Sequence, residues 1–132
     1  MTTTINASPT NGLVQTADGS GVLKVQSNGV TTNALAWVNF NGTGTVAIRS
    51  SYNVSSITDN GTGNYTLNYT TALSDANYAV VMGINRTSGA NTDSGTAPGY
   101  TSPTTSTVTV FTKNGSDAVT DYFGVSVAIF GN

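Results

Sequence analysis

The sequence predicts an all-β domain in the form of an antiparallel β-sandwich. Short stretches of β-branched and aromatic residues recur along the chain, and turns rich in Gly and Asn separate them. The only weak helix candidate, residues 72–77, is expected to be a loop or a single turn. Only 8% of the 132 residues are charged, while about half are Thr, Asn, Ser or Gly. These features are typical of one β-domain with a hydroxyl-rich surface.

Strand length divides the chain into two parts. In residues 1–33, a polar arm is followed by turn signals at Asn11-Gly12, at Asp18-Gly19 and at Asn28-Gly29, which leave room only for very short strands. Strands of that length cannot bury an apolar face alone. We therefore expect residues 1–33 to form an arm of short β segments, and residues 34–132 to form the main, β-sandwich-like domain.

The best-defined strand covers residues 34–40 and holds the single tryptophan. Leu35 and Trp37 fall on one face of this strand, and Val38 and Phe40 fall on the other. Because both faces are largely apolar, we expect the strand to lie between two packed layers. Trp37 is then expected to be a core residue rather than a platform on which a sugar stacks.

The remaining strands are expected at 45–54, 64–71, 77–86, 106–113 and 121–130. Alternation in 64–71 predicts one buried and one solvated face, whereas 77–86 and 121–130 are more continuously apolar and are expected at sheet centres. The tetrapeptide Asn-Gly-Thr-Gly occurs at 41–44 and at 60–63. We expect hairpin turns at both places, because a phosphate-binding loop needs a following helix.

One polar segment, residues 86–105, interrupts the strand pattern with about twenty residues that have almost nothing to bury. Loops of this length in a compact domain are usually functional or disordered. It offers a charge, an amide and an aromatic ring for recognition. We expect the contact residues to be Arg86, Asn91, Asp93 and Tyr100, with Tyr100 outside any strand.

The residue inventory removes most catalytic schemes. The chain has no His, no Cys and no Glu, so it cannot form a Ser-His-Asp triad or an ordinary zinc site. A pair of glycosidase Asp residues, or a calcium site from Asp93, Asp117 or Asp121, stays open as a lesser alternative, but turn roles explain most of these carboxylates. We therefore expect no enzyme, no metal and no cofactor.

Charge and hydropathy argue against two further classes of partner, nucleic acid and the membrane interior. A net charge of −2 and a pI of about 4.4 argue against nucleic acid, which needs a basic surface. No run approaches the roughly 18 apolar residues of a membrane helix, so we expect no membrane insertion. The four cations are spread along the chain. Among them, Arg49 is expected to be exposed or paired with an Asp rather than to contact a ligand.

Several segments resemble the C-terminal domain of tail fibres and related virion fibre proteins of marine and other tailed phages. The most specific is residues 36–61, which read Ala-Trp-Val-Asn-Phe-Asn-Gly-Thr-Gly-Thr-Val-Ala-Ile-Arg-Ser-Ser-Tyr-Asn-Val-Ser-Ser-Ile-Thr-Asp-Asn-Gly. Residues 18–30, 77–82 and 125–132 fit the same picture, so the resemblance covers residues 11–132.

The resemblance implies a homotrimer in the virion, in contact with other virion proteins, whose tip recognises a host cell-surface glycan or protein. It carries no catalytic motif. A trimer would also give partners to the short strands at 11–33 and cover exposed sheet edges. The first residues lack the pattern of a secretory signal, which suits release by lysis. Long fibres have a virion-joining part that this sequence lacks, so we expect a fragment or a small fibre protein.

Two other functions stay open from the sequence. One is a capsid decoration or head-fibre protein that has no receptor. The other is a carbohydrate-binding module from a bacterium, which should bind sugar as a monomer through aromatic residues on an open face.

Overall fold

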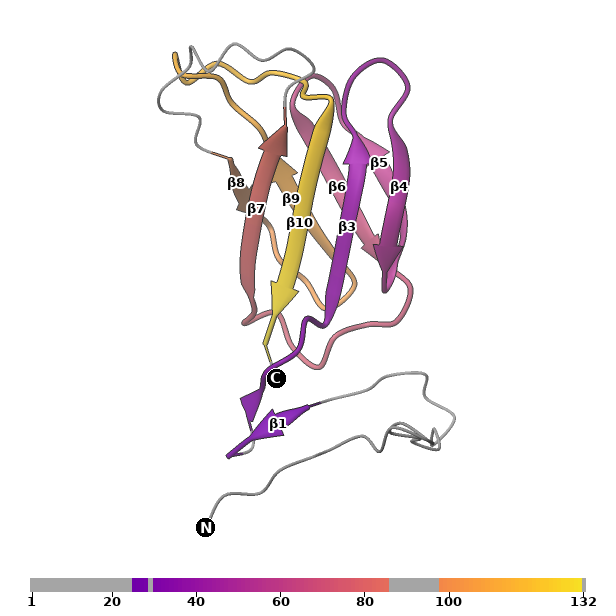
Figure 1. The fold of residues 1–132 in the computed structure, drawn as a ribbon, viewed down its shortest axis with the longest axis vertical. Coiled ribbons are helices and arrows are strands. Elements are labelled where there is room, and N and C mark those ends of the chain that lie inside the picture. Colours follow the sequence, from indigo (N-terminus) through magenta and orange to yellow (C-terminus); the bar gives the residue numbers. More distant parts are fainter. Residues whose placement is uncertain (1–24, 29, 86–97, 132) are drawn as a thin grey trace, which may run out of the picture.

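The computed structural model describes residues 25–28, 30–85 and 98–131. Two four-stranded antiparallel sheets pack face to face, and a ladder of β1 and β2 lies beyond one end of them (Figure 1). The front sheet has the order β4-β3-β10-β7, and the rear sheet has the order β5-β6-β9-β8. The predicted all-β fold with antiparallel sheets is confirmed, and the described residues contain no helix.

The strands of this part of the chain are β1 (Gln26–Ser27), β2 (Val30–Thr31), β3 (Ala36–Asn41), β4 (Ala47–Tyr52), β5 (Val54–Asp59), β6 (Asn64–Tyr69), β7 (Ala79–Asn85), β8 (Gly99–Thr101), β9 (Thr107–Phe111) and β10 (Gly124–Phe130).

The core forms because every second residue of the facing strands is apolar. In β6 the buried residues are Tyr65, Leu67 and Tyr69, so the alternation predicted for 64–71 is confirmed. Their counterparts in the front sheet include Val38 and Phe40, which are almost fully buried. The rings of Phe40 and Tyr65 meet edge to face with centroids 5.1 Å apart, which fixes the two sheets against each other.

The strand expected at 45–54 ends at Tyr52 as β4, and a strand that was not expected, β5, begins at Val54 in the other sheet. Asn53 adopts a φ of 54°, a backbone conformation that Asn tolerates better than most residues, and it separates β4 from β5. Its side-chain amide donates to the carbonyls of Leu35 and Thr71, and its side-chain oxygen accepts from the Thr71 amide. The chain therefore passes from the front sheet to the rear sheet at Asn53, which the apolar pattern alone does not reveal.

Two central positions were predicted from continuous apolar runs, and one of them is wrong. Strand β10 lies between β3 and β7, as expected. Strand β7 lies at the edge of the front sheet instead. Its inward residues, such as Met82, pack on the core, but its outward residue Val81 is 57% exposed. The apolar run in β7 therefore reflects one buried face and one apolar face that the described residues leave uncovered.

The upper end of the sandwich in Figure 1 is formed by the turns β3–β4 and β5–β6 and by the connection β9–β10. Both Asn-Gly-Thr-Gly segments are turns between antiparallel strands there, as predicted. The Asp121 carboxylate accepts hydrogen bonds from the Gly63 amide (2.6 Å) and the Tyr65 hydroxyl (2.7 Å). The Tyr65 oxygen also lies 2.9 Å from the Gly42 carbonyl, so one buried side chain links both turns to the start of β10.

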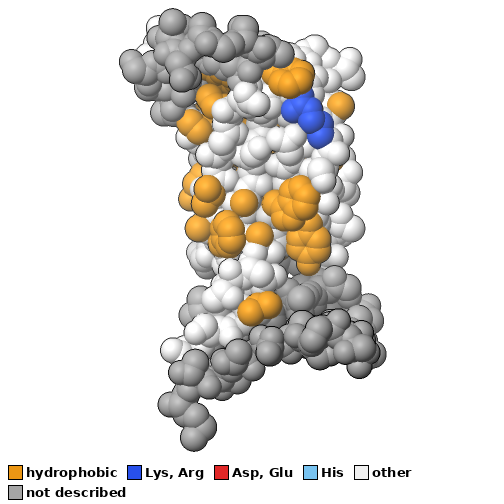
Figure 2. All heavy atoms as spheres, viewed as in Figure 1, with side chains coloured by type: hydrophobic (Ala, Val, Ile, Leu, Met, Phe, Trp, Pro, Cys, Tyr) orange, Lys and Arg blue, Asp and Glu red, His pale blue; other side chains and the backbone are white. Residues whose placement is uncertain are grey.

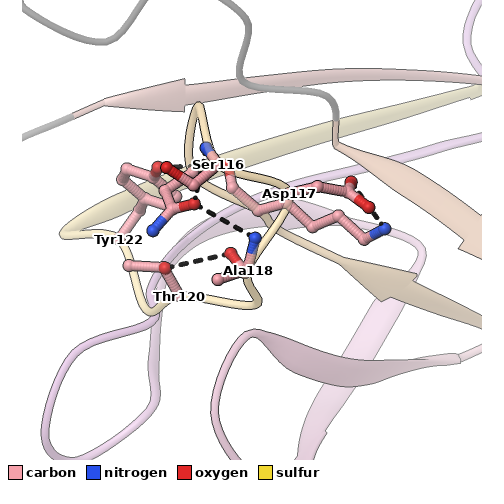
Figure 3. Close-up of polar contacts among 7 residues, drawn as sticks. Ser116, Asp117, Ala118, Thr120 and Tyr122 are labelled. Atoms are coloured by element: carbon pink, nitrogen blue, oxygen red, sulfur yellow. Dashed lines mark hydrogen bonds and ion pairs between the residues drawn. The ribbon is translucent and has the colours of Figure 1, made fainter.

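The connection β9–β10 is held by its own polar side chains (Figure 3). The Asn114 side-chain oxygen accepts from the amides of Ser116 and Ala118. The Lys113 ammonium lies 2.8 Å from Asp117, whose φ is 62°. The Tyr122 hydroxyl donates to the Lys113 carbonyl across the loop. These contacts give the polar groups of the connection hydrogen-bond partners within the connection itself, and they position the start of β10.

Gly44 and Gly63 have the same φ of 62°, but we expect their replacement by alanine to destabilise the fold to different extents. At Gly63 an added Cβ would lie 2.6 Å from the Thr112 carbonyl oxygen, whereas at Gly44 it would meet nothing within 4 Å. Gly44→Ala should lower the free energy of unfolding by about 1 kcal/mol through backbone strain alone, and Gly63→Ala by about 3 kcal/mol or more. Urea denaturation of both variants measures the difference, and equal losses would contradict the packing at Gly63.

Alkaline pH should destabilise the domain. Burial, followed by the hydrogen bond to Asp121, raises the pKa of Tyr65 well above its usual 10, and burial also raises the pKa of Tyr69 and Tyr78. Below pH 10 these hydroxyls are protonated in both states, so the full stability is present. Above pH 10 the unfolded chain loses protons that the folded chain keeps, so the free energy of unfolding falls, by about 1.4 kcal/mol per pH unit for each of Tyr65 and Tyr69. Tyr78 adds a change in the same direction.

Urea denaturation at several values between pH 9 and pH 11.5 measures this effect, together with tyrosinate absorbance. The variant Tyr65→Phe should show a smaller decrease with pH. A free energy of unfolding that is constant over this range would mean that the buried tyrosines titrate in the folded state.

Candidate functional site

An apolar row crosses the outer face of the front sheet, the face that points away from the core. Val81 of β7, Ala128 of β10, Trp37 of β3 and Tyr52 of β4 are direct partners in the strand registers, so they form one line across four strands. Trp37 is 38% exposed. Figure 2 shows hydrophobic side chains gathered across this face. A flat row that includes a tryptophan is a surface on which a ligand with an apolar face can stack.

The expectation that Trp37 is a core residue is therefore wrong. Val38 and Phe40 point into the sandwich, but no described layer covers the opposite face of β3. The signal was present in the sequence, because Trp37, Asn39 and Asn41 alternate on the same face. Two asparagines after a tryptophan at this spacing indicate a solvated face.

A polar row lies one step along the strands from the apolar row. It consists of Gly83, Ser126, Asn39 and Ser50, again direct partners in the registers. The Asn39 amide donates to the Ser126 hydroxyl at 2.8 Å. Gly83 has no side chain, and a Cβ added there would meet nothing within 4 Å. Amide and hydroxyl groups thus stand beside the tryptophan with open space at the edge strand.

These two rows enclose a shallow, almost wholly apolar depression of about 400 Å³. Its lining residues come from the three strands β3, β10 and β7: Trp37, Val38, Asn39, Val81, Met82, Gly83, Ser126, Val127 and Ala128. It forms because small residues in β10 and Gly83 lie between the larger side chains of Trp37 and Val81. An aromatic wall with a few polar groups is the usual composition of a small-ligand site.

A β-bulge in β4 places both Arg49 and Tyr52 on the outer face. Asn39 pairs with Ser50 and Phe40 pairs with Ile48, which leaves Arg49 as the extra residue. In a regular strand, residues three apart point to opposite faces, so Tyr52 would point into the core if Arg49 pointed outward. The bulge shifts the register by one residue and brings the cation and the aromatic ring to one side.

The Arg49 guanidinium is fixed above the polar row. Nη2 donates to the Phe123 carbonyl (2.6 Å), and Nη1 donates to the carbonyl of Phe40 (3.3 Å) and contacts the Asn39 side-chain oxygen (3.5 Å). Its central carbon lies 4.2 Å from the centre of the Phe123 ring. The side chain is exposed, as expected, but it pairs with no Asp among the described residues.

The candidate residues from the long polar segment are not brought to this face. Arg86, Asn91 and Asp93 lie outside the described residues. Tyr100 lies in β8, at the edge of the rear sheet, so the expectation that it stands outside any strand is wrong. It pairs with the buried Val110 but is itself 45% exposed because β8 is an edge strand. Its role in recognition stays a prediction.

The described carboxylates serve the fold rather than a site. Asp117 pairs with Lys113, and Asp121 accepts from Tyr65 and Gly63. The described residues contain no group of three or more His, Cys, Asp or Glu side chains that could hold a metal ion. The same part of the chain has no helix that is long and apolar enough to cross a membrane.

Comparisons of the chain with protein-family models, with curated proteins and with solved structures found no match. The resemblance to phage fibre proteins therefore stays a prediction.

The position of Trp37 predicts its contribution to stability. Trp37→Ala should lower the free energy of unfolding by about 1–2 kcal/mol, because the ring is 38% exposed and only partly buried. Phe40→Ala, three residues along the same strand, removes a fully buried ring and should cost about 3–5 kcal/mol. Urea denaturation of the two variants measures this, and a loss at Trp37 as large as at Phe40 would place Trp37 in a packed layer.

Proposed function

We propose that this chain is a non-enzymatic attachment domain of a virion fibre, which binds a host cell-surface glycan through the outer face of the front sheet. The observation that carries the proposal is the exposed Trp37 beside a polar row on an otherwise apolar, hollowed face. The resemblance of residues 36–61 to fibre proteins supports the biological setting.

A sugar ring matches both rows of this face. One side of a pyranose ring carries C–H groups and can stack on the indole of Trp37, while the ring hydroxyls can exchange hydrogen bonds with Asn39 and Ser126. The outer face offers no carboxylate among the described residues, so it supplies contacts for binding without the paired acids of glycoside hydrolysis.

Several copies of a shallow site bind a repeating ligand more tightly than one copy does. Because an open depression buries only part of a ligand, we expect weak affinity for one site. Three sites on a homotrimer would bind a repeating polysaccharide much more tightly without any new contact. The ladder β1–β2 lies beyond the end of the sandwich opposite the turns β3–β4 and β5–β6 (Figure 1), so the chain enters the domain from that end and not across the outer face.

A structural role in the virion is the second candidate. Strand β7 is a seven-residue sheet edge without a charged side chain, and such edges pair readily with other chains. In a decoration or head-fibre protein, this edge and the apolar row would contact another copy or another virion protein. In that case Trp37→Ala would change assembly rather than sugar binding.

An array of bacterial surface polysaccharides tests the proposal. The wild-type protein should bind at least one of them, and Trp37→Ala should weaken that binding about tenfold or more. Tyr100→Ala is the matched control, because it removes an exposed aromatic side chain from the rear sheet. The bound polysaccharide should keep its chain length.

The outcomes separate the alternatives. Loss of binding in Tyr100→Ala with full binding in Trp37→Ala would move the site to the rear sheet. Binding to purified capsids with no binding to any polysaccharide would favour the structural role. Light scattering of both variants shows whether either substitution changes the number of chains in the assembly.

A further inference from the structure

We infer that the glycan bound at this face is acidic, with a carboxylate or phosphate group that meets Arg49. The inference rests on the proposed function and names the class of saccharide. Its basis is a positioned cation that has no counter-charge among the described residues, held on the same face as Trp37 and one step beyond the polar row.

The Arg49 side chain is held in one position by its contacts with β3 and with Phe123, the residue that precedes β10. The side chain starts on β4 and reaches over β3 to the start of β10, where it donates to the Phe123 carbonyl. Gly124 lies beneath it, since a Cβ added there would be 3.5 Å from Nη1. The Phe123 ring packs on the guanidinium, and three neutral oxygens accept from it. A side chain held this way loses little further freedom when a ligand binds.

Donors remain on Arg49 for a ligand. A guanidinium has five N–H groups, and the contacts to Asn39, Phe40 and Phe123 use three of them, on Nη1 and Nη2. This leaves the Nε–H and one Nη2–H without a partner among the described residues. The guanidinium is planar, and two parallel N–H groups on one of its edges match the two oxygens of a carboxylate or a phosphate.

Charge on this face favours an anion. The described Asp residues lie elsewhere: Asp59 ends β5 in the rear sheet, Asp75 follows β6, and Asp117 and Asp121 belong to the connection β9–β10. Figure 2 shows basic atoms beside a hydrophobic side chain near the upper end of this face and no acidic atoms among the side chains coloured by type. The net charge of −2 repels an anion only weakly at range, because salt screens charges beyond about 10 Å.

The geometry also sets the order of contacts. Trp37 and Asn39 are two residues apart on β3, so their side chains stand roughly 7 Å apart along the strand. Arg49 contacts the Asn39 side chain from the side away from Trp37. A saccharide that runs along β3 therefore places one ring on Trp37 and the acid group of a neighbouring ring at Arg49.

The test uses an array of acidic bacterial polysaccharides together with neutral copies of the same polymers. Uronic acids are carboxyl-reduced in one set, and phosphate substituents are removed in another, which distinguishes the two sources of charge. We expect wild-type protein to bind the acidic form at least about tenfold more tightly than its neutral copy. Arg49→Gln should remove this preference, and Arg49→Lys should keep part of it.

Lys113→Gln is the matched control, because Lys113 is a cation paired with Asp117 in the connection β9–β10. It should leave the preference unchanged. Equal binding of acidic and neutral copies would overturn the inference and leave the proposed function standing. Binding to none of the polysaccharides would overturn the proposed function itself. Thermal melting checks that Arg49→Gln is folded, and if it is not, the comparison of acidic and neutral copies still decides.

Discussion

The side chain of Tyr65 connects the parts of the sandwich on which the outer face depends. Its ring is fully buried and packs edge to face on Phe40, which joins the rear sheet to the front sheet. Its hydroxyl reaches the Asp121 carboxylate and the Gly42 carbonyl, and the Gly42 amide in turn donates to the Tyr122 carbonyl. The end of β3 and the start of β10 are therefore held together at this end of the front sheet.

The arrangement of the candidate site follows from these contacts together with one irregularity. Because β3 and β10 are adjacent and in register, Trp37 meets Ala128 and Asn39 meets Ser126. The bulge at Arg49 then adds a cation and a second aromatic residue from β4 to the same side. The result is an apolar row, a polar row and a charge in sequence along β3, supported by strands rather than by loops. Sites on strands hold their geometry more closely than sites on loops.

Much of the fold could be predicted from local patterns. Alternation fixed the buried face of β6, and Asn-Gly located two hairpin turns, because both signals depend on neighbouring residues only. The change of sheet at Asn53 could not be predicted, since one positive φ leaves the apolar pattern intact. The candidate site was missed for a related reason. Apolar residues on both sides of β3 suggested two covered faces, but coverage depends on which sheets pack together, which no single strand reports.

The bulge in β4 makes the outer face sensitive to chain length as well as to composition. Removing Ile48 would place Arg49 opposite Phe40 and restore regular alternation, so Arg49 would turn toward the core and no longer share a side with Tyr52. A single codon deletion would thus remove the cation from the candidate site in one event. Insertions and deletions within β4 would therefore change this face as strongly as substitutions, although the face is built from strands and not from loops.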